Sequence, residues 1–208
     1  MILNNNRSSL IIDLQYFPPV TFFKNLSAFT YCVFDQYEHF QKMSFRNRCT
    51  LLGGNGKLML SIPLEGGRNQ KMLMKDVRIS QKENWQDRHW KTITSCYNKS
   101  PWFSHYSDEL HALFTTAHLF LVDWNIACYE WAADKLSIHT PWRLSDSYNK
   151  NYGDSVADWR GKLMPATIDR IFPAGQRYPQ VFEDRFGFVP DLSVMDYLFC
   201  VGPGPVTI

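Results

Sequence analysis

Three cationic side chains lie close together in one short segment of the chain. If that segment is extended, Arg46 and Arg48 point to the same face, because successive side chains of a strand alternate. Guanidinium groups bind phosphate oxygens in bidentate fashion, and Lys42 adds a third positive charge. The segment therefore predicts a site for an anionic small molecule, such as a nucleotide or nucleotide-sugar. The alternative is a solvated loop with surface salt bridges to Asp35 and Glu38.

The same region holds two candidates for proton transfer. His39 is the candidate general base, because the unperturbed pKa of a histidine lies near neutrality. Asp35 is the second catalytic candidate, and it directly follows the apolar run Tyr31–Phe34. Asn47 would face away from the two arginines, where it either orients the substrate or holds the backbone. Gln15 is a second amide that would orient the substrate.

The polar residues that begin at Gln15 and those that begin at Asp35 both follow predicted β-strands. Residues 10–14 are an apolar run of strand length, and Pro18 and Pro19 end this strand and open a helix over 20–29. A second strand is predicted over 31–35. Strand, helix and strand with short connections predict a βαβ unit, in which ligands bind at the carboxyl ends of parallel strands. This placement favours a binding site over a solvated loop.

The rest of the first half predicts further strands. A hairpin is predicted over 48–63, with Gly53–Gly56 at its turn. These glycines could instead cradle a phosphate, but neither a Lys-Ser/Thr pair nor a helix follows them. An alternating strand is predicted over 75–79, and Ser80 is expected to cap the next helix. Residues 65–71 are predicted to form a mobile loop.

The second half is predicted to be mainly helical. From residue 82 onward, apolar positions recur at helical spacing along Trp85, His89, Ile93, Cys96 and Tyr97. Three further helices are predicted: one that begins after Pro101, one over 122–136, and one over 190–200 with Asp191 as its cap. Residues 137–176 are predicted to be irregular. We therefore predict an α/β fold: a Rossmann-like, mainly parallel sheet with flanking helices, in a single domain over 1–208 with a loosely ordered leader at 1–9.

Composition excludes several classes of protein. The net charge is only +2 for 208 residues, which argues against a nucleic-acid partner. No apolar run is long enough for a membrane span, and residues 1–7 lack the charged and apolar regions of a signal peptide, so export is not expected. The five cysteines are odd in number and form no C-x-x-C pair, which is typical of reduced thiols in a cytoplasmic protein. His111 and His118 are too far apart on a helix to share a metal ion, and Gly-x-Gly-x-x-Gly is absent, so neither a metal nor a cofactor is predicted.

Four segments of the chain resemble the WbqC-like family of bacterial proteins. Gln15-Tyr16-Phe17-Pro18 is similar to the family's N-terminal Gln-Pro-x-Tyr/Phe-Phe-Pro signature, although the proline after the glutamine and the preceding histidine are missing. The other matches are Phe40-Gln41-Lys42 through Arg46-Asn47-Arg48 with Leu60–Leu64, Trp85 with Trp90–Ile93 and Tyr97–Phe103, and Pro190–Phe199 with Gly202. The region 137–176 departs from the family, because the helix and strand expected before the last signature are replaced by an irregular segment.

The resemblance implies a role in the biosynthesis of O-antigen-like surface polysaccharide. It implies a transferase that moves an acyl or aminoacyl group onto a nucleotide-linked amino sugar. The alternative is a non-catalytic binding or scaffold subunit of such a pathway. Under the enzyme hypothesis His39 and Asp35 are catalytic, and the residues predicted to bind the anionic substrate are Gln15, Tyr16, Phe17, Gln41, Lys42, Arg46, Asn47 and Arg48.

Overall fold

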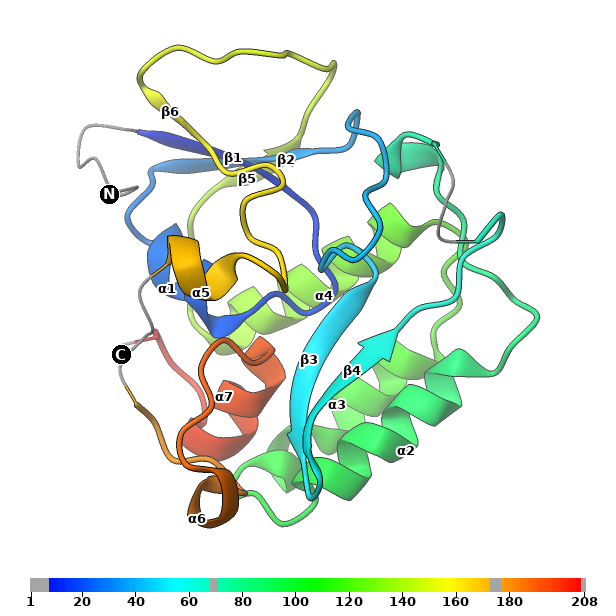
Figure 1. The fold of residues 1–208 in the computed structure, drawn as a ribbon, viewed down its shortest axis with the longest axis vertical. Coiled ribbons are helices and arrows are strands. Elements are labelled where there is room, and N and C mark those ends of the chain that lie inside the picture. The colour runs from blue at the N-terminus through cyan, green and yellow to red at the C-terminus, as the bar shows by residue number, and fades with distance from the viewer. Residues whose placement is uncertain (1–7, 68–70, 173–176, 207–208) are drawn as a thin grey trace.

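A four-stranded parallel sheet forms one layer of the molecule (Figure 1). The computed structural model describes residues 8–67, 71–172 and 177–206. The strand order is β5-β2-β1-β6, and each neighbouring pair is parallel. The predicted α/β fold with a parallel sheet is therefore confirmed. The strands are β1 (Ser9–Asp13), β2 (Tyr31–Asp35), β5 (Trp142–Leu144) and β6 (Val156–Asp158).

The predicted βαβ unit is confirmed. Helix α1 (Val20–Leu26) connects β1 to β2, and it begins directly after Pro19. The two strands pair over their whole length, with Ser9 opposite Tyr31 and Asp13 opposite Asp35. Because both strands run in the same direction, their last residues lie side by side at the carboxyl end of the sheet. Ser9 belongs to β1, so the predicted loose leader is wrong at this residue, and residues 1–7 lie outside the described residues.

The predicted hairpin is also confirmed. Strands β3 (Arg48–Gly53) and β4 (Gly56–Ser61) pair antiparallel, and β3 contacts helices α2 (Trp85–Tyr97) and α7 (Val194–Val201). In Figure 1 the hairpin lies across the helices of the lower half of the molecule. Residues 68–70 of the predicted mobile loop 65–71 lie outside the described residues.

Helices build the remaining layer, and their interior is strongly aromatic. The stripe predicted along α2 is correct, because its five members are the buried residues of that helix. Asn125 on α4 donates hydrogen bonds to the carbonyl oxygens of Arg46 (2.8 Å) and Leu14 (3.4 Å), so this helix holds the segments that follow β1 and precede β3. The longer helices are α2 (Trp85–Tyr97), α3 (Phe103–Thr115), α4 (Leu121–Lys135) and α7 (Val194–Val201), and the short ones are η1 (Met74–Asp76), α5 (Ile168–Ile171) and α6 (Glu183–Phe186).

Residues 137–176 are not irregular throughout. They contain β5 and β6, which pair with β2 and β1 and complete the sheet at both edges. Each strand has only three residues, which is too short for an alternating pattern to be visible in the sequence. Residues 173–176 lie outside the described residues.

Three local predictions are wrong. Residues 75–79 do not form a strand, because η1 takes the first part and Ile79 makes only an isolated bridge with Leu64. Ser80 does not cap α2, which begins at Trp85. Helix α7 is capped by Ser193, whose hydroxyl accepts a hydrogen bond from the Met195 amide at 3.4 Å, whereas Asp191 has a left-handed backbone (φ 59°) that cannot begin a helix.

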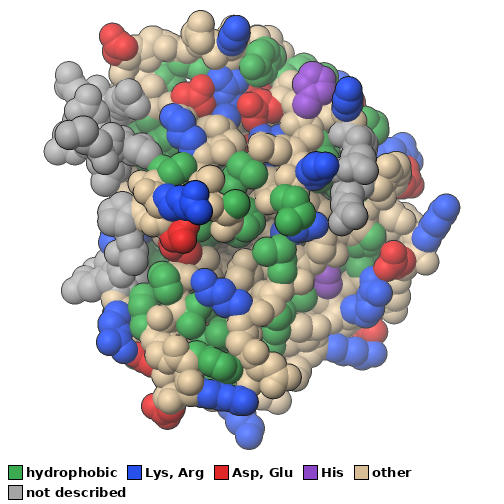
Figure 2. All heavy atoms as spheres, viewed as in Figure 1, with side chains coloured by type: hydrophobic (Ala, Val, Ile, Leu, Met, Phe, Trp, Pro, Cys, Tyr) green, Lys and Arg blue, Asp and Glu red, His purple; other side chains and the backbone are tan. Residues whose placement is uncertain are grey.

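The surface carries mixed charge. On the face shown in Figure 2, basic and acidic side chains are interspersed with hydrophobic ones. A nucleic-acid-binding surface instead gathers lysines and arginines into a patch or stripe. Among the described residues, no helix combines the length and the apolar character that crossing a bilayer requires.

Candidate functional site

Three aspartates stand at the carboxyl ends of neighbouring strands. Asp13, Asp35 and Asp158 are the last residues of β1, β2 and β6. Because the strands are parallel, all three carboxylates lie at the carboxyl end of the sheet, which is the usual place for a ligand site in an open α/β sheet. Buried carboxylates require partners, and two arginines supply them.

Arg160 joins the ends of β2 and β6. Its Nη1 lies 2.8 Å from Asp35 Oδ2, and its Nη2 and Nε donate to the two oxygens of Asp158 at 2.6 and 3.0 Å. These bonds to Asp158, and those to Asp35, raise the pKa of Arg160, so the guanidinium stays charged. Asp35 is fully buried, and its other oxygen accepts hydrogen bonds from the Ser145 hydroxyl and the Tyr37 amide, both at 2.9 Å. Both oxygens of the buried Asp35 carboxylate are therefore bonded to protein groups.

The same guanidinium organises the loop that follows β5. Nη1 and Nη2 donate to the backbone carbonyls of Asn149 (3.0 Å) and Lys150 (3.4 Å). The charge also lies 5.3 Å from the ring centre of Tyr148 and 5.1 Å from that of Tyr152, within the range of cation–π attraction. Arg160 thereby fixes Tyr148 at the edge of a surface pocket.

Arg46 does not share a face with Arg48. Its side chain is 2% exposed, with Nε 3.5 Å from Asp13 Oδ2, and its terminal nitrogens donate to the Glu38 carboxylate and the His39 carbonyl oxygen. The sequence prediction assumed an extended segment, but turns precede β3 and the strand begins only at Arg48. The predicted salt bridge to Glu38 does form, but on a buried arginine.

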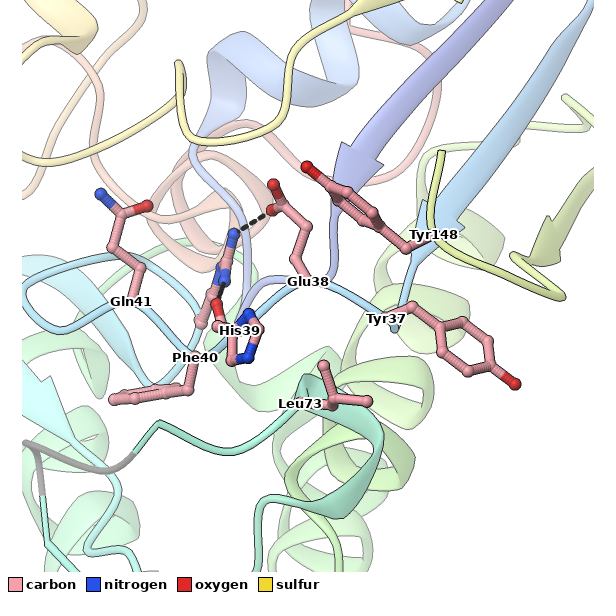
Figure 3. Close-up of a pocket in the computed structure, with 8 residues that line it drawn as sticks. Tyr37, Glu38, His39, Phe40, Gln41, Leu73 and Tyr148 are labelled. Atoms are coloured by element: carbon pink, nitrogen blue, oxygen red, sulfur yellow. Dashed lines mark hydrogen bonds and ion pairs between the residues drawn. The ribbon is translucent and has the colours of Figure 1, made fainter. Parts of the chain in front are cut away.

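The pocket beside these ion pairs has a volume of about 700 Å³. Figure 3 shows the Glu38 carboxylate and the Tyr148 ring on one side of this pocket, with Phe40 and Leu73 on the other. Its lining consists of Tyr37, Glu38, His39, Phe40, Gln41, Arg46, Leu73 and Tyr148. We call it the Glu38 pocket.

Glu38 is the carboxylate of the cluster that lines the pocket, and solvent reaches it there. Its side chain is 21% exposed, whereas those of Asp13 and Asp35 are 1% and 0% exposed. Burial raises the pKa of Glu38 above its ordinary value, and the Asp13 and Asp35 carboxylates add to this rise against the opposing charge of Arg46. A carboxylate with a raised pKa is a stronger base than an ordinary one.

Two predicted site residues line the Glu38 pocket and are accessible. His39 and Gln41 are both exposed and both contribute to its wall. Gln15 is instead buried, where its Nε2 donates to Asp13 Oδ2 and to the Leu163 carbonyl oxygen, each at 3.2 Å. Gln15 therefore supports a member of the carboxylate cluster and does not reach the pocket.

Tyr16 and Phe17 lie in the core. Both side chains are fully buried, and the Tyr16 hydroxyl is 3.0 Å from Nδ1 of His89 on α2. Burial also lowers the pKa of His89 to about 4, so this histidine is neutral at pH 7. The sequence prediction that Tyr16 and Phe17 contact the substrate does not fit this placement. The Tyr16 amide donates to the Phe45 carbonyl oxygen at 2.9 Å, so the chain after β1 is held against the segment 40–48 and not directed toward solvent.

Lys42, Asn47 and Arg48 line a second pocket of about 340 Å³, which we call the Arg48 pocket. Asn47 Nδ2 donates to the Ile62 carbonyl oxygen at 2.9 Å, so the alternative in which Asn47 holds the backbone is confirmed. The three predicted cations are thus divided: Arg46 belongs to one pocket, and Lys42 and Arg48 belong to the other.

Sequence reasoning missed Arg160 and Tyr148, and it assigned Glu38 only the role of an ion-pair partner. A usable signal was present for two of the three aspartates, since Asp13 and Asp35 each follow an apolar run, and buried carboxylates at strand ends require cations. Among the described residues, no group of three histidine, cysteine, aspartate or glutamate side chains is arranged to hold a metal ion. The carboxylates at the carboxyl end of the sheet are bound by arginines.

A family model described as the WbqC-like protein family matches residues 15–164. This match covers more than half of the chain and contains both pockets and Arg160. Comparison with the curated proteins and with the solved structures gives no match.

Proposed function

Because the chain belongs to the WbqC-like protein family, we propose that it is an enzyme of bacterial surface-polysaccharide biosynthesis. The reaction that suits the site is transfer of an acyl or aminoacyl group to the amine of a nucleotide-linked amino sugar. The observation that carries this proposal is the Glu38 carboxylate, which has a raised pKa and stands in an open pocket at the carboxyl end of a parallel sheet.

Glu38 is placed to accept a proton from an amine. The sugar amine attacks the carbonyl carbon of an activated acyl donor, a nitrogen–carbon bond forms, and the bond to the donor's leaving group breaks. Glu38 takes the proton that the amine must lose, and the leaving group departs with the electron pair. Arg46 holds Glu38 in place, because it is itself fixed by Asp13 and the His39 carbonyl oxygen.

The other pocket residues suit a sugar. Tyr148 offers an exposed aromatic face on which a sugar ring can pack, and Arg160 fixes that face. Gln41 supplies an amide that can bond to sugar hydroxyl groups, and His39 is a second group able to exchange protons. Asp35 supports the site through Arg160 and does not act on the substrate.

A non-catalytic binding or scaffold subunit is the second candidate. The observation that favours it is the mutual neutralisation of Asp13, Asp35, Arg46 and Arg160, since a set of saturated ion pairs can serve the fold alone. The two candidates differ in what they demand of Glu38: only the enzyme requires its charge for a chemical step.

The deciding experiment is acyl transfer to nucleotide-linked amino sugars, followed by mass spectrometry of the product, with a panel of activated acyl donors. Wild type should form the amide, and Glu38→Gln should bind the sugar nucleotide but transfer the acyl group at least about 100-fold more slowly, as removal of a general base does. Glu65→Gln is the matched control, because Glu65 pairs with Arg78 at the surface. Transfer by Glu38→Gln at the wild-type rate would exclude the proposed role of Glu38, and binding without transfer by wild type would favour the scaffold.

A further inference from the structure

We propose that the Arg48 pocket binds the phosphate groups of a nucleoside diphosphate-linked amino sugar while its sugar occupies the Glu38 pocket. This inference rests on the proposed function and names the part of the chain that holds the anionic end of its substrate. It replaces the clamp expected from the sequence, in which Arg46 acted together with Arg48.

Within the described residues, the donors of Arg48 have no strong acceptor. Its Nη1 lies 3.0 Å from Met43 Sδ and 3.8 Å from Met59 Sδ, and thioether sulfur is a weak acceptor. Its Nε is buried and has no hydrogen-bond partner among the described residues. Arg46 and Arg160, in contrast, are bound by carboxylates. A guanidinium held against sulfur is free to bind an anion without breaking an ion pair.

The charge around Arg48 is positive. Lys42 is exposed, and neither Lys42 nor Arg48 forms an ion pair with an acidic side chain within the described part of the chain. The described residues that line the pocket with them include no aspartate and no glutamate. Met43, a residue that is 54% exposed and has an unbranched side chain, can move aside for a ligand.

The two pockets meet at Phe40, which lines both. On one side of Phe40, four carboxylates (Asp13, Asp35, Glu38 and Asp158) outnumber the three cations bound among them (Arg46, Arg160 and Lys162). The remaining negative charge lies at Glu38 in the pocket, so this side repels phosphate and attracts an amine. The other side offers Lys42 and Arg48, which form no ion pair with any residue that the structure describes and attract phosphate. A ligand that carries an amine at one end and phosphates at the other matches this division of charge, and electrostatic complementarity of this kind fixes orientation.

The test is isothermal titration calorimetry of the full chain with the nucleotide-linked amino sugar, with the nucleoside diphosphate alone and with inorganic phosphate. Lys42→Met and Arg48→Met should each weaken binding of the first two by roughly tenfold or more, the effect expected for a lost charge-assisted bond. Both variants should also reduce the dependence of binding on salt. Lys82→Met removes another exposed lysine and should leave affinity unchanged.

Glu38→Gln separates this inference from the proposed function. It should leave binding of the nucleoside diphosphate unchanged and slow transfer at least about 100-fold. If Lys42→Met and Arg48→Met bind the nucleoside diphosphate as tightly as wild type, or if wild type binds none, the phosphate site is wrong, whereas loss of transfer in Glu38→Gln would still support the enzyme. Binding of inorganic phosphate in place of the nucleotide would identify a simple anion site. Because Lys42 is exposed, its substitution also answers the question if Arg48→Met fails to fold.

Discussion

Replacement of Arg160 by methionine should destabilise the protein strongly, although Arg160 follows β6, a strand of only three residues. Methionine keeps an unbranched apolar stem like that of arginine and removes the charge and the donors. The fully buried Asp35 carboxylate then keeps only the Ser145 hydroxyl and the Tyr37 amide. Asp158, whose side chain is 34% exposed, can bond to water instead.

The expected cost follows from this difference in burial. Removing one partner of a buried ion pair costs about 3–5 kcal/mol, whereas exposed pairs contribute about 0–1 kcal/mol. Asp35 therefore accounts for nearly all of the loss, and a total of about 4 kcal/mol is a large part of the 5–15 kcal/mol by which domains are typically stable. With a urea dependence of about 2–3 kcal/mol/M, the midpoint of unfolding should fall by roughly 1–2 M.

The assay is equilibrium urea unfolding followed by tryptophan fluorescence. Arg143→Met is the matched control, because Arg143 pairs with Asp146 at side-chain exposures of 49% and 90% and should lose no more than about 1 kcal/mol. Adding Asp35→Asn to Arg160→Met should recover part of the loss, since it removes the unpaired charge. Limited proteolysis should also cut the double and single variants more readily at residues 148–152, which Arg160 holds.

Two results would refute this reasoning. The first is an Arg160→Met variant no less stable than Arg143→Met, which would mean that water reaches Asp35. The second is a double variant whose loss equals the sum of the two single losses, because independent sites add and coupled ones do not.

Three further predictions concern stability. Burial raises the pKa of Asp196 to about 6, so its folded form resists ionisation and stability should fall as the pH rises from about 4 to about 6, by about 3 kcal/mol. Burial lowers the pKa of His89 to about 4, so the protein should lose about as much stability as the pH falls from about 6.5 to about 4. The two effects oppose each other between about pH 4 and 6. In urea unfolding, the plot of unfolding free energy against pH should therefore slope in opposite directions in Asp196→Asn and His89→Asn and be flatter in wild type. Gly202→Ala should lower the melting temperature by several degrees, because Gly202 has φ +102° and a Cβ there would lie 2.4 Å from the Trp102 ring, whereas Gly153→Ala meets nothing within 4 Å and should be neutral; equal melting temperatures would contradict this. All five cysteines are buried, so a thiol reagent should label them only in denaturant, and rapid labelling of the native protein would show that the interior opens.

Local sequence patterns predicted the elements that need no distant partner to be recognised. The apolar run before Asp13, the two prolines after it and the second run before Asp35 define the βαβ unit. The stripe along α2 is regular because one face of that helix is buried over its whole length. In these elements the spacing of apolar residues and the position of prolines carry the information, and both can be read directly.

The candidate site depended on contacts between distant parts of the chain. The sequence alone placed polar residues at strand ends and cations after β2, and that much is correct. Only the tertiary structure separated Arg46 from Arg48, because the choice between a turn and a strand at these residues is made by packing against α4. It also brought Arg160 to Asp35, although the two residues are 125 positions apart in the sequence, through a three-residue strand that exists only when β1 is beside it. Charges find their partners across the folded chain, and no local pattern encodes which carboxylate each arginine will meet.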